Sequence, residues 1–246
     1  MALERPAWPL PAGVVALTST RDGGASQGPY GSFNLARHVD DAPAAVDQNR
    51  AQLARALPPG ASVRWLRQVH GTRVVADGDD TGTPADAAVS RRPGVACAVL
   101  TADCLPVLFC SADGAVVAAA HAGWRGLADG VLEATIAAMA VEPGELSAWL
   151  GPAIGPRAFE VGPEVREAFA AQWPGSGTAP EAAFRPGREG RLHADLHALA
   201  AARLAAAGVK ACHRDPRCTA SDPGRFYSYR RDGETGRMVS LILIKP

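Results

Sequence analysis

Three short motifs bring a histidine or a cysteine to places where chemistry is expected. They contain His70, Cys104 and His121, and each of these residues stands at the end of a predicted element, close to a glycine or proline that lets the backbone turn. Functional groups often lie on such loops because rigid elements hold them in place. These three residues are therefore the first candidates for a catalytic or metal-binding site.

Two histidines and one cysteine form a plausible set of zinc ligands. A catalytic zinc ion usually has three protein ligands and keeps its fourth position open for water or substrate. The long intervals between the three residues exclude a finger-type site. The residues alone leave a structural interpretation open, in which Cys104 is a buried core thiol and His70 and His121 are hydrogen-bonded supports.

The same residues also allow nucleophilic catalysis. Cys104 could be a nucleophile that His121 activates, with Asp103 or a nearby asparagine orienting the imidazole. The protein would then be a cysteine hydrolase or amidase.

The composition favours a cytoplasmic protein with a small ligand. The chain has 246 residues, enough for one domain spanning residues 1–246, and it contains 25 basic and 25 acidic residues. This balance gives no reason to expect a nucleic acid or a membrane as partner. An odd number of cysteines, three of them in apolar runs, favours a reducing cytosol. The sequence predicts neither a signal peptide nor a membrane span.

Short runs rich in valine, leucine and small apolar residues predict strands. These runs are residues 14–20, 63–69, 73–76, 87–90, 95–102, 106–111 and 115–120. Residues 95–102 and 115–120 lack polar alternation, as expected of strands that are covered on both faces. Near the C-terminus, residues 226–231 and 238–244 flank a turn that predicts a β-hairpin.

Helical periodicity and capping residues predict four helices, at residues 43–57, 124–140, 163–173 and 195–207. Residues 174–190, rich in glycine and proline, predict a surface loop. Strands and helices mix without strict alternation. We therefore expect an α+β fold, a single domain in which mixed β-sheets pack together with helices on the outside.

A series of motifs, in order along almost the whole chain, carries a resemblance to a known family. The motifs are STRDGG (19–24), NLARHVDD (34–41) with Asn49-Arg50, QVHG (68–71), ADA (85–87), TADCLP (101–106), AHAGWRG (120–126), LGPAIGP (150–156), FEVG (159–162) and FYSYRR (226–231). Together they resemble the laccase-domain family, also named the polyphenol oxidase family. Its members are regarded as purine nucleoside phosphorylases with adenosine deaminase activity.

The resemblance implies a zinc site. The family's ligands are the histidine of QVHG, the cysteine of ADC and the histidine of AHAGWRG, which are His70, Cys104 and His121 in this chain. Many relatives carry a cysteine after Ile-Gly-Pro, where this chain has Arg157 and Ala158, so a role of that cysteine cannot apply here.

The family's older name implies copper oxidation, and the sequence argues against it. A multicopper site needs many imidazoles, typically in closely spaced pairs. This chain has six histidines and no His-x-His pair. His193 and His197 are four residues apart, and we interpret them as solvated structural residues at a helix start.

The implied reactions require groups that hold an anion and move protons. Phosphorolysis needs a phosphate site, for which we predict Arg50 and Arg125, with Arg21 and Arg231 as further candidates. Deamination needs a carboxylate that carries protons. The candidates for this role are Asp103 and Glu160, and the latter also counts among the predicted substrate-binding residues.

Other polar and aromatic residues complete the predicted site. Asn34 and Gln68, from the shared motifs, are predicted to bind substrate. Phe33, Trp124 and Tyr227 could stack on a purine, although core packing is the commoner use of such residues.

The sequence therefore predicts a cytoplasmic zinc enzyme, monomeric or weakly associating, that acts on purine nucleosides and phosphate. The resemblance implies phosphorolysis of adenosine, inosine and methylthioadenosine to base and pentose 1-phosphate, with adenosine deamination. Cys104, His121, His70 and Asp103 would form the catalytic group. The alternatives are the cysteine hydrolase, the copper-dependent polyphenol oxidase and a non-catalytic binding protein with a structural zinc.

Overall fold

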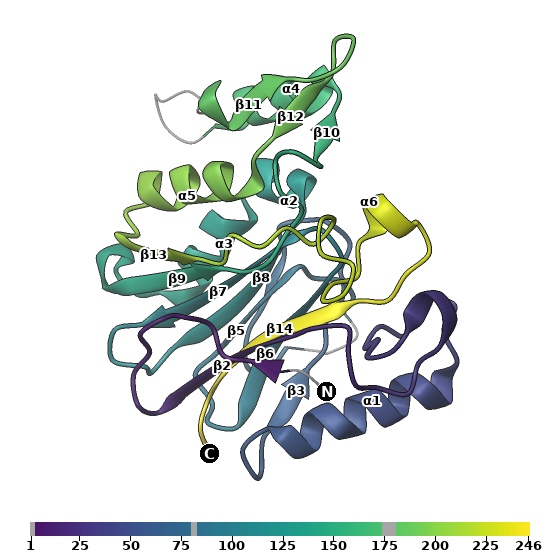
Figure 1. Ribbon diagram of the computed structural model, residues 1–246. Coiled ribbons are helices and arrows are strands. Elements are labelled where there is room, and N and C mark those ends of the chain that lie inside the picture. Colours follow the sequence, from purple (N-terminus) through teal and green to yellow (C-terminus); the bar gives the residue numbers. More distant parts are fainter. Residues whose placement is uncertain (1–2, 80–82, 174–180) are drawn as a thin grey trace.

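Two β-sheets form the centre of the molecule (Figure 1). The computed structural model describes residues 3–79, 83–173 and 181–246. The first sheet has the order β1-β2-β14-β6-β3 and the second has the order β13-β9-β7-β8-β5-β4. A small third sheet has the order β10-β12-β11.

The strands of the first sheet are β1 (Leu3–Glu4), β2 (Val14–Ser19), β14 (Met238–Ile244), β6 (Val95–Thr101) and β3 (Ser62–Arg64). Those of the second are β13 (Ala211–Arg214), β9 (Leu146–Leu150), β7 (Leu105–Ser111), β8 (Val117–Ala122), β5 (Ala87–Ser90) and β4 (Val74–Val75). The third contains β10 (Glu160–Val161), β12 (Leu192–Ala194) and β11 (Phe184–Pro186).

The two large sheets pack against each other through an apolar cluster. Val99 and Ile242 of the first sheet belong to the same cluster as Leu108 and Val117 of the second. All seven residues of β7 are buried. This explains the lack of polar alternation in the central strands, because each has the other sheet on one face and helices on the other.

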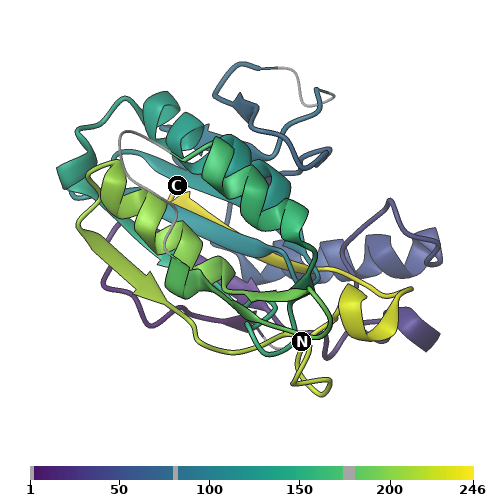
Figure 2. The same ribbon diagram turned by 90° about the horizontal axis from the view of Figure 1, so that it is seen from above.

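The helices are α1 (Pro43–Ala56), α2 (Trp124–Asp129), α3 (Val131–Met139), α4 (Pro163–Ala171), α5 (Leu196–Ala206) and the short α6 (Tyr229–Asp232). Helices α1, α3 and α5 cover the outer faces of this sandwich (Figure 2), while α4 lies beside the small third sheet (Figure 1). Leu53 of α1 packs in one cluster with Leu241 of the first sheet. Leu132 of α3 and Leu199 of α5 pack in another cluster with Val107 of the second sheet. The predicted α+β fold, with packed mixed sheets and outer helices, is confirmed.

Local sequence signals explain where several helices begin and end. α1 starts at Pro43, whose ring suits the first helical position. The side chain of Asp195 caps α5 by accepting a hydrogen bond from Ala198 N at 3.0 Å. Among the described residues, no helix is long and apolar enough to cross a membrane.

The C-terminal hairpin prediction is wrong. Residues 229–232 form α6, whose cap is the Ser228 hydroxyl accepting from Arg231 N. β14 pairs antiparallel with β2 and β6 instead of with residues just before it. An apolar strand gains more from a central place in the sheet than from a local partner, because both its faces become buried.

Two further predictions need correction. The predicted helix 124–140 is two helices, because Gly130 adopts a left-handed conformation with φ of 100° between α2 and α3. The predicted loop 174–190 contains η3 (Glu181–Ala183) and β11, while residues 174–180 lie outside the described residues. Strands β1, β9, β10, β12 and β13 were not predicted, and β3 and β4 are shorter than expected.

Candidate metal centre and pocket

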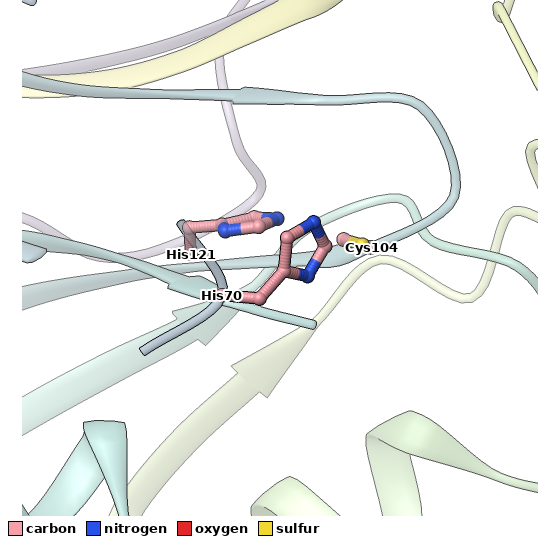
Figure 3. Close-up of side chains that lie close together, drawn as sticks. All are labelled: His70, Cys104 and His121. Atoms are coloured by element: carbon pink, nitrogen blue, oxygen red, sulfur yellow. The ribbon is translucent and has the colours of Figure 1, made fainter. Parts of the chain in front are cut away.

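His70, Cys104 and His121 come from three separate segments of the chain and lie close together (Figure 3). One ligand atom from each side chain lies within 4.8 Å of the others. His121 lies in β8 opposite Pro106 of β7, so Cys104 comes just before the paired part of β7. His70 reaches the same place from the loop after β3, and its ring centroid is 4.7 Å from that of His121.

A buried carboxylate organises this centre. Asp86 Oδ1 lies 2.8 Å from His121 Nδ1. The same carboxylate accepts backbone hydrogen bonds from His70 at 2.9 Å, from Gly71 at 2.7 Å and from Val69. Burial acts to raise the pKa of Asp86, but these hydrogen bonds outweigh it and lower that pKa. Asp86 therefore fixes both the ring of one histidine and the loop that carries the other.

The ADA motif contains Asp86, but the sequence gives no sign of these contacts. They join residues that are 15 to 35 positions apart.

The two histidines of this centre have pKa values shifted in opposite directions. Burial acts to lower the pKa of His121, but the neighbouring Cys104 and Asp86 side chains outweigh it and raise the pKa to about 9. Burial and the neighbouring His121 lower the pKa of His70.

The donor set fits a zinc ion. Zinc bonds of about 2.0 to 2.3 Å with tetrahedral angles place ligand atoms roughly 3.3 to 3.6 Å apart. The three atoms, within 4.8 Å, need only a small contraction. With Nδ1 of His121 held by Asp86, its Nε2 is the nitrogen available to a metal.

Two glycines of the AHAGWRG motif allow the loop that carries His70 to pack closely against this motif. A methyl group at Gly123 would lie 2.6 Å from His70 Nδ1 and 3.2 Å from Cys104 Sγ. A methyl group at Gly126 would lie 2.7 Å from Gly71 O. Both positions require glycine because the two loops approach each other closely.

A pocket of about 480 Å³ opens beside the three ligands. This volume is within the range of small-molecule sites, about 300 to 1,000 Å³. It is lined by His38, Gln68, His70, Leu100, Thr101, Ala102, Cys104, His121, Trp124, Arg125, Tyr229 and Arg237. These described lining residues include two arginines and no carboxylate.

Two of the predicted substrate-binding residues, Gln68 and Arg125, line this pocket. Gln68 exchanges two hydrogen bonds with the backbone of Leu100, at 2.8 and 2.9 Å, which fixes its amide at the pocket wall. The guanidinium of Arg125 lies 4.4 Å from the ring centroid of Trp124. Of the three aromatic residues considered for stacking, Trp124 alone is at the pocket; Phe33 and Tyr227 are fully buried.

The predicted proton carriers lie elsewhere. Asp103 accepts hydrogen bonds from the hydroxyls of Thr219 and Ser228, at 2.6 and 3.0 Å, and from Arg230 N at 2.7 Å. Glu160 Oε1 accepts from Arg188 N. Neither carboxylate lines the pocket, so their roles in proton transfer stay predictions without positional support.

Arg50, Arg21, Arg231 and Asn34 are also outside the pocket. Arg50 lies 4.0 Å over the ring of Trp65 and donates to Leu35 O. The guanidinium groups of Arg21 and Arg231 donate to backbone carbonyls, and Asn34 is fully buried. Their predicted roles in substrate binding likewise remain predictions.

His38, Tyr229 and Arg237 are pocket residues that were not predicted. His38 and Tyr229 belong to two of the shared motifs, which is the signal that could have indicated them. Arg237 belongs to none, and it reaches the pocket only because β14 lies beside β6.

The remaining cysteines and histidines are structural or peripheral. Cys97 and Cys110 are buried, as predicted, and burial raises the pKa of each thiol to about 12. Cys212 and Cys218 are free thiols. His197 is buried and bonds Gly151 O at 2.9 Å, so its structural interpretation holds but its predicted solvation is wrong.

Comparison with known proteins identifies the family. A family model described as multi-copper polyphenol oxidoreductase laccase matches residues 15–245. The chain belongs to this family. Among the described residues, His70, Cys104 and His121 are the one group that could hold a metal ion, whereas a multicopper centre needs several.

Relatives within this family carry an enzyme's name. A Pseudomonas aeruginosa protein named purine nucleoside phosphorylase is 54% identical, covering 98% of this chain and 97% of the relative. The Escherichia coli purine nucleoside phosphorylase YfiH is 51% identical, covering 96% of both chains. The crystal structure of a Neisseria meningitidis protein matches with a TM-score of 0.92 at 48% identity, covering 99% of both chains. That of YlmD from Geobacillus stearothermophilus gives 0.84 at 33% identity, covering 96% of this chain and 93% of the other.

Proposed function

We propose that this protein is a zinc-dependent purine nucleoside phosphorylase. The observation that carries the proposal is the pocket, in which a three-residue metal-ligand set meets two guanidinium groups and no carboxylate among the described lining residues. The names of relatives more than 50% identical support the same activity. The substrates are purine nucleosides such as adenosine, inosine and methylthioadenosine, together with phosphate.

The proposed reaction explains the charge of the pocket. A phosphate oxygen bonds to the anomeric carbon while the carbon–nitrogen bond to the base breaks and leaves its electron pair on the base. Negative charge on phosphate and base therefore needs stabilisation in the transition state. Arg125 offers a fork of donors for phosphate, and zinc, when bound, supplies Lewis-acid stabilisation.

The apolar side of the pocket suits a purine. Leu100, Ala102 and Trp124 line it, and Tyr229 stands at its edge with 63% of its surface exposed. Aromatic side chains recognise flat bases by stacking. We assign the base to this side and the phosphate to the arginines.

Deamination of adenosine is a second activity that the same centre supports. A metal ion held by His70, Cys104 and His121 would supply the Lewis-acid chemistry that hydrolytic deamination of a purine needs. Asp103 and Glu160 lie outside the pocket, so no predicted carboxylate is at hand to carry protons. We therefore expect deamination to be slower than phosphorolysis.

One observation favours the cysteine hydrolase as a rival. Cys104, His121 and Asp86 are arranged as nucleophile, base and orienting carboxylate. His70 in the same cluster has no role in such a triad, whereas it completes a metal site. The zinc enzyme is thus the better account of all four residues.

The test incubates the purified protein with inosine and with adenosine, each with and without phosphate. We expect phosphate-dependent release of hypoxanthine or adenine with an equal amount of pentose 1-phosphate. Cys104→Ser should lose both zinc and activity, while Cys97→Ser, at a buried thiol away from the pocket, should keep both. A zinc-free protein that is fully active and labelled at Cys104 would instead support the hydrolase.

The cellular setting follows from the same chemistry. All five cysteines are free, as suits a reducing compartment, and we propose a cytoplasmic location. As the sequence analysis predicts, we also propose a monomer or a weak oligomer.

A further inference from the structure

Arg237 presents unused hydrogen-bond donors to the pocket. Its Nη1 donates to Thr235 O at 2.7 Å and to Gly236 O at 3.0 Å. Within the described part of the chain, its Nε and Nη2 have no hydrogen-bond partner and the guanidinium forms no ion pair. Three of its five N–H groups therefore remain for a ligand.

The backbone around Arg237 is held rigidly. Its N–H donates to the Oδ1 of Asn34 at 2.9 Å, and Asn34 is fully buried. The preceding Gly236 packs so closely that a methyl group there would lie 2.7 Å from the ring of Tyr227. Asn34 is thus a positioning residue for Arg237, which gives this motif residue a role without contact to the pocket.

Against burial, Cys104 and Asp103 act electrostatically to raise the pKa of Arg237, but neither forms an ion pair with its guanidinium among the described residues. Arg125, the other pocket arginine, also has no carboxylate partner among the described residues, and His38 adds an imidazole. A partly buried guanidinium without an ion-pair partner is less favourable than one that a ligand anion pairs. Burial lowers the pKa of Arg237, yet an arginine side chain keeps its proton in proteins.

We propose that Arg237, with His38 beside it, is the main binding group for the phosphate co-substrate. The proposal rests on the phosphorolysis proposed above. It assigns phosphate binding to a residue that lies in none of the shared motifs. A guanidinium fork can bond two phosphate oxygens at once, and the free Nε and Nη2 donors form such a fork. Arg50 cannot serve here, because its guanidinium covers Trp65 outside the pocket.

The test compares steady-state kinetics of the zinc-loaded wild-type enzyme, Arg237→Gln and Arg237→Lys. Arg237→Gln should raise the KM for phosphate by roughly tenfold to a hundredfold, since a charge-assisted hydrogen-bond pair is lost. The KM for inosine should change much less. Arg237→Lys keeps the positive charge but loses the two parallel donors of the guanidinium. Its KM for phosphate should lie between those of the wild type and Arg237→Gln.

The matched control is Arg225→Gln. Arg225 has an exposed side chain whose contact with Glu4 is long, at 3.6 Å, and it does not line the pocket. Its phosphate KM should equal that of the wild type. Zinc content and melting temperature are measured for every variant, and Arg237→Lys serves as the test if Arg237→Gln is unfolded. A phosphate KM within twofold of wild type in the folded variants would overturn the proposal, as would equal increases for phosphate and inosine.

Direct binding separates this proposal from the function on which it rests. Isothermal titration of the zinc-loaded protein with inorganic phosphate alone should show binding that weakens in Arg237→Gln. If the wild type binds phosphate through Arg237 but releases no base, the proposed function fails and the subsite stands. If the wild type releases base and its phosphate binding is unaffected by Arg237→Gln, the subsite fails alone.

Discussion

Asp86 is the residue on which the metal centre depends most after the ligands themselves. It is fully buried and contacts the ring of His121 and the backbone of the loop that carries His70. Carboxylates behind metal-bound histidines fix the ring orientation and raise its basicity. The three candidate ligands are therefore positioned by a residue that is not one of them.

Asp86→Asn should weaken zinc binding. An amide cannot accept from His121 Nδ1 and from three backbone N–H groups with the strength of a carboxylate, so we expect the zinc Kd to rise by about 10- to 100-fold. Competition with a chromophoric chelator measures this constant. Asp79→Asn, at an exposed turn, is the control, and an unchanged Kd in Asp86→Asn would refute the role given to Asp86.

Asp103 supports the loop next to Cys104 instead of facing the pocket. It holds a backbone φ of 90° and ties its loop to Thr219, Ser228 and Arg230. Asp103→Asn should lower the free energy of unfolding by about 1 to 3 kcal/mol, measured in urea. The pH profile of kcat should keep its shape. Loss of one limb of that profile would show instead that Asp103 carries a proton.

The sequence predicts which residues could hold a metal, but it does not predict the residues that contact and position them. The three ligands could be predicted because each lies in a motif with a recognisable pattern of neighbours. The contacts of Asp86 and the place of Arg237 could not, because they depend on which strands lie side by side.

Among the elements, the pairing of β7 with β8 positions two of the candidate ligands. His121 lies in β8, and Cys104 comes just before the paired part of β7. α2 begins after Gly123, which lies against the His70 ring. The sequence predicted both central strands and the α2 start. It could not predict the break at Gly130, since the apolar spacing continues across it into α3.

Gly123→Ala should disturb the metal centre without unfolding the protein. The added methyl group would lie 2.6 Å from His70 Nδ1, so the His70 ring must shift from its present place beside Cys104 and His121. We expect zinc affinity to fall more than about tenfold. Gly144→Ala, at a site with open space, is the matched control. Equal zinc affinity in both variants would contradict the packing described here.

Across the whole molecule, strands from the two ends of the chain lie side by side in one sheet. β14, the last strand of the chain, lies between β2 and β6 in the first sheet. The C-terminal strand therefore pairs with a strand from the N-terminal part of the chain. The hairpin prediction failed for this reason: local turn residues were present, but burial in the sheet decided the pairing.

Arg203 joins the helical layer over the second sheet. It is buried, forms an ion pair with Glu133 at 2.7 Å and donates to Ala128 O and Gln172 O. Arg203→Met should lower the free energy of unfolding by about 3 to 5 kcal/mol and the Tm by on the order of 10 °C. Calorimetry compares it with Arg225→Met. A Tm within two degrees of wild type would show that the layers are held without this contact.

We propose that one metal ion held by His70, Cys104 and His121 enables phosphorolysis in the adjacent pocket. The most direct measurement titrates metal-free protein with zinc and follows phosphate-dependent base release together with bound zinc. Activity should rise in proportion to occupancy and level off at one zinc per chain, and Cys104→Ser should show neither. Full turnover by metal-free protein, or activity that continues to rise well beyond one zinc per chain, would contradict the account.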